Sequence, residues 1–252
     1  MIELRIEGAA AVATLVRPPV NAVNEAWIER LAEIVEQVEG NAAIGVLWIR
    51  SALDAFCAGA DLELMRACFE SAAGRERMIG LVRRMQQVFA RLERLGAVSI
   101  AELGGAALGG GLELALACDL RVVADSAKLG LPEAGLGLLP GAGGTQRLTR
   151  ACGDALARRL ILGAEIVDGT NAVALGIAHW VAPRAGLEAF TRALVERIAR
   201  LPPATLAACK RCIGAALDPQ ADGYALELAE TRRLYGATET QRRVKRFLDK
   251  QG

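Results

Sequence analysis

The sequence predicts an α/β protein whose C-terminal part is helical. Short apolar runs alternate with helix-forming segments over residues 1–185, as in folds built around a buried sheet. Beyond residue 185, helical patterns over 186–200, 203–217 and 222–248 follow one another without a strand between them. The 252 residues are 53% hydrophobic and 23% charged, which excludes wholesale disorder. We expect a core over 1–185 that carries the functional site and a helical C-terminal region over 186–252.

The elements of the core are expected from periodicity and from residues that begin or end helices. Asn24 is a suitable N-cap, apolar residues then recur at helical spacing, and Gly40 ends that helix. The β-branched run over 44–49 is typical of a strand buried on both faces. Strands are expected over 2–7, 11–17, 44–49, 98–101 and 120–124, and helices over 24–40, 78–95 and 112–118.

The charge balance argues against several classes of partner. Thirty Lys and Arg against 29 Asp and Glu leave a net charge of +1, so no bulk attraction draws the chain to nucleic acid or anionic lipid. The N-terminus alternates apolar and charged residues, unlike a signal peptide, and no apolar stretch reaches the roughly 20 residues of a membrane span. We expect a reduced, cytoplasmic protein, with Cys209 and Cys212 serving packing.

The most informative segment for chemistry covers residues 107–114, where three consecutive glycines precede a helix. Glycines there are costly unless the chain bends sharply or something lies against the backbone. The first N–H groups of a helix have no internal partner and carry the positive end of its dipole. Gly110 could therefore donate to an oxygen that becomes negative, with Glu113 on the same helix face.

Two further segments are candidates. Small residues over 56–62 would let a ligand approach the backbone. Glu133 follows a proline in apolar surroundings, where a carboxyl would have a raised pKa and could move protons near neutral pH.

Each of these segments also has a purely structural interpretation. Residues 56–62 could be a surface turn, the three glycines a packing device, and Glu133 a solvated loop residue. A phosphate loop is rejected because Leu112-Glu113, not Lys-Ser or Lys-Thr, follows the glycines. His179, the lone histidine, is expected to be structural, and no acidic cluster has the spacing of metal ligands.

Together the segments resemble the enoyl-CoA hydratase/isomerase (crotonase) superfamily. The similarity extends over about residues 12–182, and its motifs are 17–24, 56–62, 107–119, 131–133 and 140–148. The resemblance implies a crotonase-like spiral of β-β-α units whose C-terminal helices assemble a homotrimer, often stacked as a hexamer. It also implies an acyl-CoA thioester as substrate and no separate cofactor.

The resemblance assigns roles to individual residues. The N–H groups of Ala60 and Gly110 would form an oxyanion hole for the thioester oxygen. Glu113 and Glu133, 20 residues apart, would act as base and acid in hydration of a 2-enoyl-CoA. Because many members with other chemistry lack one of these glutamates, the hydratase branch is preferred. The residues expected to contact substrate and CoA are Val20, Ala22, Ala58, Ala60, Asp61, Leu62 and Gly110.

Alternatives remain open at this point. One is an isomerase that shifts the double bond, or a hydratase for a branched or aromatic acyl-CoA. Another is a non-catalytic protein that binds CoA thioesters or RNA. Glu102 and Gly104 depart from the family pattern, and Pro19-Val20 stands where a lysine is often found.

Overall fold

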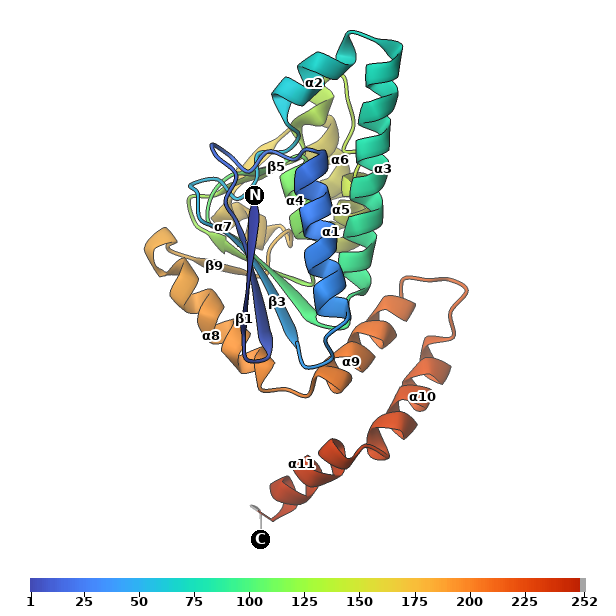
Figure 1. Ribbon diagram of the computed structural model, residues 1–252. Helices are drawn as coiled ribbons and strands as arrows, with labels where there is room; N and C mark the ends of the chain where they lie inside the picture. The colour runs from blue at the N-terminus through green and yellow to red at the C-terminus, as the bar shows by residue number, and fades with distance from the viewer. Residues whose placement is uncertain (250–252) are drawn as a thin grey trace.

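A six-stranded sheet forms the centre of the fold (Figure 1). Its strand order is β1-β2-β3-β4-β6-β9, in which β1 and β2 form an antiparallel hairpin and all other pairs are parallel. A smaller sheet has the order β5-β7-β8. The structure is a computed structural model and describes residues 1–249. The strands are β1 (Ile2–Glu7), β2 (Ala10–Leu15), β3 (Val46–Ser51), β4 (Val98–Leu103), β5 (Ala107–Leu108), β6 (Leu120–Ala124), β7 (Lys128–Gly130), β8 (Ile166–Asp168) and β9 (Trp180–Ala182).

Helices cover both faces of the large sheet (Figure 1). Helices α1 and α3 lie side by side on one face, and α8 packs on the other against β2, β3, β4 and β6. The helices are α1 (Glu25–Glu39), α2 (Leu62–Phe69), α3 (Ala72–Arg94), α4 (Gly110–Ala117), α5 (Gly144–Cys152), α6 (Asp154–Leu162), α7 (Gly169–Ala174), α8 (Leu187–Ala199), α9 (Pro203–Ala215), α10 (Gly223–Tyr235) and α11 (Thr238–Leu248). Two short 3₁₀ helices, η1 (Pro132–Leu136) and η2 (Arg184–Gly186), complete the chain.

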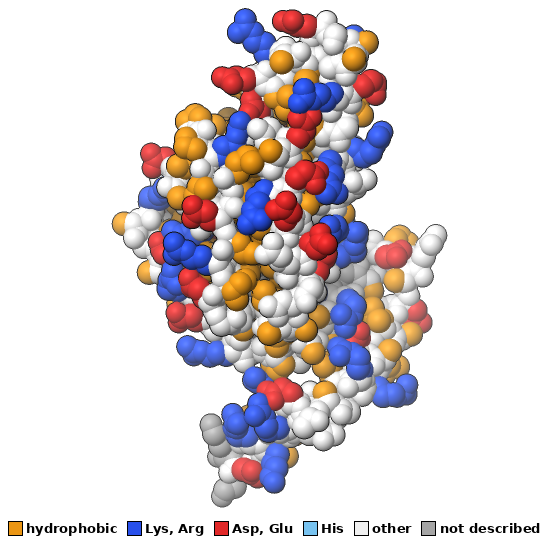
Figure 2. Space-filling view, in the orientation of Figure 1, with side chains coloured by type: hydrophobic (Ala, Val, Ile, Leu, Met, Phe, Trp, Pro, Cys, Tyr) orange, Lys and Arg blue, Asp and Glu red, His pale blue; other side chains and the backbone are white. Residues whose placement is uncertain are grey.

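Helix α1 follows the sequence prediction. The Asn24 side chain accepts a hydrogen bond from the Trp27 N–H at 2.9 Å, and Gly40 ends the helix. The apolar face of α1 is buried, and three ion pairs join its solvent side to α3, where acidic and basic side chains alternate (Figure 2). Apolar packing on the buried side and ion pairs on the solvent side thus join α1 to α3.

Some boundaries differ from those expected. Helix α3 begins at Ala72 rather than residue 78, because Ser71 caps it by accepting from the Gly74 N–H. Helix α2 was not predicted, and Asp61 starts it by accepting from two N–H groups of its first turn. The pattern over 222–248 is two helices, since the chain turns at Gly236 and Ala237.

Helix α4 runs through the interior of the molecule. All eight of its residues are buried, including Glu113, and it packs against α3, α5 and β5. A helix that is apolar almost all round is typical of such a buried position. Its N-terminus therefore delivers Gly110 and Glu113 to the inside of the fold.

The last helices differ from one another in burial. Helix α8 buries Leu187, Leu194 and Ile198 among others against the sheet, whereas α10 and α11 have no buried residue and extend away from the body (Figure 1). The boundary at residue 185 stays a prediction. Within residues 1–249, no helix is both long and apolar enough to cross a bilayer.

Candidate active site

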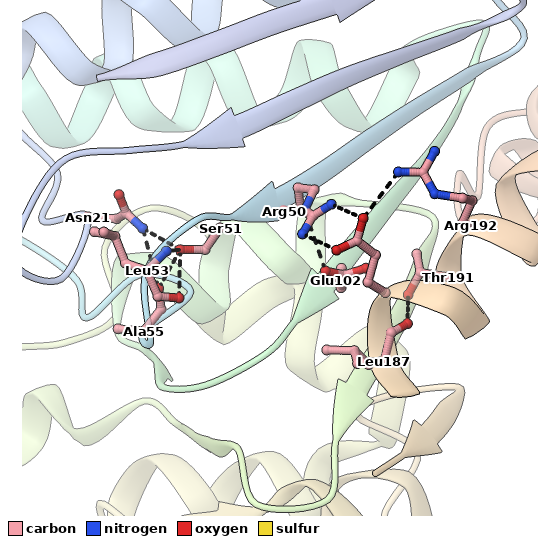
Figure 3. A network of polar contacts seen from close by, with 10 residues as sticks. Asn21, Arg50, Ser51, Leu53, Ala55, Glu102, Leu187, Thr191 and Arg192 are labelled. Atoms are coloured by element: carbon pink, nitrogen blue, oxygen red, sulfur yellow. Dashed lines mark hydrogen bonds and ion pairs between the residues drawn. The ribbon is translucent and has the colours of Figure 1, made fainter. Parts of the chain in front are cut away.

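Asn21 joins the opening turn to the loop that leads to Ala60 (Figure 3). It is fully buried and has a φ of 54°, in the left-handed region that asparagine tolerates better than most residues. Its Nδ2 donates to Ser51 Oγ at 2.8 Å and to the Phe56 carbonyl at 2.9 Å. The Cys57 thiol donates to the Asn21 carbonyl at 3.1 Å. This one side chain therefore fixes two loops that are 30 or more residues apart.

The peptide between Gly59 and Ala60 is held by its carbonyl. The Val23 N–H donates to the Gly59 oxygen at 2.8 Å, and the Asp61 N–H donates to the Val23 oxygen at 3.0 Å. In a trans peptide the C=O and N–H point in opposite directions. The Ala60 N–H therefore points away from Val23, and no acceptor for it is found among residues 1–249.

The peptide between Gly109 and Gly110 is oriented in the same manner. The Glu113 N–H donates to the Gly109 oxygen at 2.9 Å, so the Gly110 N–H points outward from the start of α4. Within the described chain it too has no acceptor. The two loops are in contact, because a Cβ placed on Gly59 would lie 3.6 Å from the Gly110 nitrogen. Two unpaired donors thus lie on touching segments, a suitable arrangement for a developing oxyanion.

The Glu113 carboxyl is buried, three residues after Gly110 in the first turn of α4. Only 3% of the residue is exposed, and Oε1 accepts from the Gly144 N–H at 2.7 Å. The pKa of Glu113 is raised to about 7, mainly by burial and to a smaller extent by the nearby Glu133 carboxylate. The N–H groups of Gly144 and Ala142 and the Arg147 guanidinium oppose this shift. A carboxyl with this pKa can exchange protons near neutral pH.

Glu133 brings the second carboxyl to the same place from η1. A Cβ on Gly109 would lie 2.9 Å from Glu133 Oε1, so the carboxyl covers the residue before Gly110. Burial raises the pKa of Glu133, as the apolar sequence context predicted. Its Oε2 is buried and, within the described chain, has no hydrogen-bond partner. An unpaired buried carboxyl oxygen is a group available to a substrate.

The remaining candidates lie along the opening turn and the 57–62 loop. The Ala58 N–H donates to the Val20 carbonyl at 3.0 Å, and the Ala22 carbonyl accepts from Arg17. The Asp61 carboxylate pairs with Arg17 and caps α2, so both of its oxygens are occupied within the protein. Leu62 is 71% exposed at the edge of this loop. The structure brings these segments together, and their contacts with a substrate stay predictions.

Comparison with known proteins identifies the family of this chain. The family model for enoyl-CoA hydratase/isomerase matches residues 5–251. The chain belongs to this family. A probable enoyl-CoA hydratase of Bacillus subtilis (strain 168) is 40% identical over 207 residues, 82% of this chain and 79% of that protein. The mitochondrial methylglutaconyl-CoA hydratase of Mus musculus is 41% identical over 162 residues, 64% of this chain and 50% of that protein.

The crystal structure of an enoyl-CoA hydratase from Bacillus anthracis has the same fold as this family member. Its TM-score is 0.92 at 31% identity, with 99% of this chain and 96% of that chain covered. The predicted fold class is thereby confirmed: a crotonase-like α/β fold with a helical C-terminal part. The resemblance stated from the motifs is confirmed as well.

Arginines lie against Glu102 and Gly104, the two residues that depart from the pattern of the enoyl-CoA hydratase/isomerase family. Glu102 is buried and lies 3.7 Å from Arg50 Nε, beside α8 (Figure 3). Burial raises the pKa of Glu102, and Arg50 opposes that shift. At Gly104, an added Cβ would lie 2.2 Å from Arg184 Nη1, so the guanidinium fills the space of the missing side chain.

Three residues near Glu113 or its loop were not predicted from the sequence as parts of the site. Gly144, Arg147 and Gln86 surround the carboxyl of Glu113 or the loop that contacts it. The 140–148 motif marked the segment, but no local signal indicates that its amides face a glutamate 31 residues earlier.

His179 takes no part in this site. His179 Nδ1 accepts from the Arg121 N–H at 3.0 Å, which supports a structural role. Over residues 1–249, no group of three or more His, Cys, Asp and Glu is arranged to hold a metal ion.

Proposed function

We propose that this protein adds water across the 2,3 double bond of a 2-enoyl-CoA thioester. The observation that carries the proposal is the buried Glu113 carboxyl and the buried Oε2 of half-buried Glu133, together with two backbone N–H groups that have no acceptor within residues 1–249. Family membership supports an acyl-CoA thioester as the substrate class. Relatives with hydratase in their names support the reaction type.

The thioester oxygen would accept from the N–H groups of Ala60 and Gly110. Attack of water on the β-carbon moves negative charge onto this oxygen, so the donors stabilise the transition state more than the substrate. Each oxyanion donor is worth roughly 3 kcal/mol in enzymes where one has been removed. The thioester is itself the electron sink, which is why the scheme needs no separate cofactor.

The two carboxyls would divide the proton transfers between them. Glu113, with a pKa of about 7 and two backbone N–H groups opposing any further rise, is suited to take a proton from the attacking water. Glu133, whose Oε2 has no partner within the described chain, is suited to deliver a proton to the α-carbon. The roles exchange in the reverse direction.

The test is hydration of crotonyl-CoA, followed by loss of the conjugated-thioester absorbance. Glu113→Gln and Glu133→Gln should each lower kcat by about 10²–10⁴, since each removes one proton-transfer group. Glu196→Gln, on the exposed side of α8, is the control and should keep the wild-type rate. Full activity of Glu133→Gln would exclude the two-carboxyl scheme.

A branched substrate is the second candidate, because methylglutaconyl-CoA hydratase is among the similar proteins. A panel of enoyl-CoA esters of graded length and branching would identify the acyl group by kcat/KM. A 3-enoyl-CoA in the same panel tests for isomerase activity, since a shifted double bond without added water would favour that alternative. RNA retained at physiological salt, with no turnover of any thioester, would favour a binding protein.

A further inference from the structure

The loop over residues 140–144 lies between the long helix α3 and the Glu113 carboxyl. A Cβ placed on Gly141 would lie 3.0 Å from Val82 Cγ1 of α3, tighter than side chains normally approach. The missing side chain therefore lets α3 come close to the loop backbone. One turn of α3 further along, Gln86 lies against the same loop.

Gln86 holds the carbonyl of Gly141. Its Nε2 donates to the Gly141 oxygen at 2.6 Å. That carbonyl and the Ala142 N–H belong to one peptide, so they point in opposite directions. With the carbonyl held at α3, the N–H points away from α3. Two residues later in the same loop, the Gly144 N–H donates to Glu113 Oε1 at 2.7 Å.

Arg147 holds the next two peptides of the loop. Its Nη1 donates to the Ala142 carbonyl at 3.1 Å, and its backbone N–H donates to the Gly143 carbonyl at 2.9 Å. The Gly143 carbonyl and the Gly144 N–H again share a peptide, and this N–H donates to Glu113. Arg147 is itself paired with Glu93 of α3. Helix α3 thus reaches this loop at two carbonyls: at Gly141 through Gln86, and at Ala142 through the guanidinium that Glu93 pairs with.

The charges around Glu113 come from the elements packed on α4. Glu133 faces it from η1 and Arg147 from α5, while Glu93 of α3 lies behind Arg147 and Arg121 lies at the far end of α4. Gln86 is neutral and exposed. Replacing it changes no charge in this set and removes only the hydrogen bond that holds the Gly141 carbonyl.

We propose that Gln86 is a positioning residue for Glu113, acting through the loop over residues 140–144, whose Gly144 N–H donates to the carboxyl. The loss of the Gln86 bond releases the Gly141 end of this loop and weakens the donation from Gly144. The ionised form of Glu113 is then less favoured, and a higher pH is needed to ionise it. The kinetic part of this inference rests on the proposed function, and the titration part does not.

The chain offers a matched control in the adjacent glutamine. Gln87 is also exposed, and its side chain makes no hydrogen bond within residues 1–249. We expect Gln86→Leu to raise the pKa of Glu113 by about half a pH unit, roughly a threefold change in the ratio of protonated to ionised carboxyl. Gln87→Leu should leave it unchanged. Gln86→Lys, which restores a donor, should return the pKa to the wild-type value or below, and Gln87→Lys measures the effect of the added charge alone.

Two readouts separate the inference from the proposed function. The ¹³Cδ resonance of Glu113, assigned with Glu113→Gln, is titrated in protein labelled with [¹³C]glutamate and without substrate. The acid limb of the kcat/KM profile is measured with crotonyl-CoA. Equal pKa values in Gln86→Leu and Gln87→Leu would overturn the inference. A shifted resonance in a protein that hydrates no thioester would instead uphold the inference and reject the proposed function.

Discussion

The buried carboxyl of Glu113 links the chemistry of the site to the stability of the fold. Its pKa is about 7 in the folded chain, against 4.5 for a free glutamate. The folded state therefore binds this proton more tightly than the unfolded state does. Stability contributed by the protonated form is present below pH 4.5 and is lost as the pH rises toward 7.

Replacing this carboxyl should stabilise the protein while it removes activity. At pH 8 we expect Glu113→Gln to raise the free energy of unfolding by up to about 3 kcal/mol, because the amide keeps the bond from Gly144 without a buried charge. Near pH 4.5 the two proteins should unfold alike. Urea titrations at both pH values measure this, and a variant less stable than the wild type at pH 8 would contradict it.

The close contact between Gly111 and the backbone of Cys57 leads to a second prediction at the scale of residues. A Cβ on Gly111 would lie 2.0 Å from the buried Cys57 carbonyl, so Gly111→Ala should destabilise the fold by about 3 kcal/mol through overpacking. Gly80→Ala is the control, because nothing lies within 4 Å of its added Cβ in the middle of α3. That substitution should stabilise by about 0.5–1 kcal/mol. Thermal unfolding of the two variants should therefore shift in opposite directions.

The sequence was most informative about residues whose chemistry is unusual for their setting. Glu113 after three glycines and Glu133 after a proline were predicted as candidates, and the structure places the Glu133 carboxyl beside Gly109 and the Glu113 carboxyl against Gly144. Gln86 could not be found in this way. Its contact with Gly141 spans 55 residues, and an exposed glutamine on a helix has no local signature.

At the scale of elements, α4 is anchored at the end opposite Gly110. Arg121, only 6% exposed, donates to the carbonyls of Ala115, Cys118 and Ile177 and so occupies the C-terminus of the helix. Burial lowers the pKa of this guanidinium, and within the described chain no carboxylate pairs with it. A cation at this end of a helix also suits the helix dipole.

Two arginines of different burial give a test of this anchor. Arg121→Met should cost about 3 kcal/mol or more, because it leaves three carbonyls without a donor in the interior. Arg84→Met removes a surface pair with Glu29 between α1 and α3, and should cost less than about 1 kcal/mol. Urea unfolding compares them, and similar losses would show that Arg121 does not anchor α4.

Local sequence predicted elements well where a cap and an apolar period coincide. Helix α1 has both, and its bounds agree with the expectation from Asn24 and Gly40. Over 222–248 the helical pattern continues through a turn at Gly236, so the sequence predicts one helix where the structure has two. The short strands β7 and β8 were not predicted, since three residues are too few to show a period.

For the molecule as a whole, the C-terminal helices have more apolar surface than a single chain covers. Tyr224, Leu228, Tyr235 and Phe247 on α10 and α11 are 60–84% exposed. A cavity of about 550 Å³ lies along the same helices, lined by Tyr235, Val244 and Leu248 among others. Exposed apolar patches of this kind are typical of interfaces between proteins.

We expect the chain to assemble through these helices as a homotrimer or a hexamer. Leu228→Glu and Phe247→Glu should lower the mass found by light scattering toward that of one chain, because a buried charge opposes association. Ile79→Glu, an equally drastic change on exposed α3, should leave the mass unaltered. A wild-type protein that is monomeric at micromolar concentration would exclude this role for α10 and α11.

The groups proposed for chemistry come from four segments: the loop at Ala60, α4, η1 and the loop before α5. These segments follow one another along more than 80 residues of the chain. The Gly59–Ala60 peptide is held by Val23 of the opening turn, and the Glu113 carboxyl by Gly144 of a later loop. During refolding, turnover should consequently recover no earlier than the slowest of these segments docks, even if most helices have already formed. The recovery of enzymatic activity would then measure the last step of folding, whereas circular dichroism measures the earlier formation of helices.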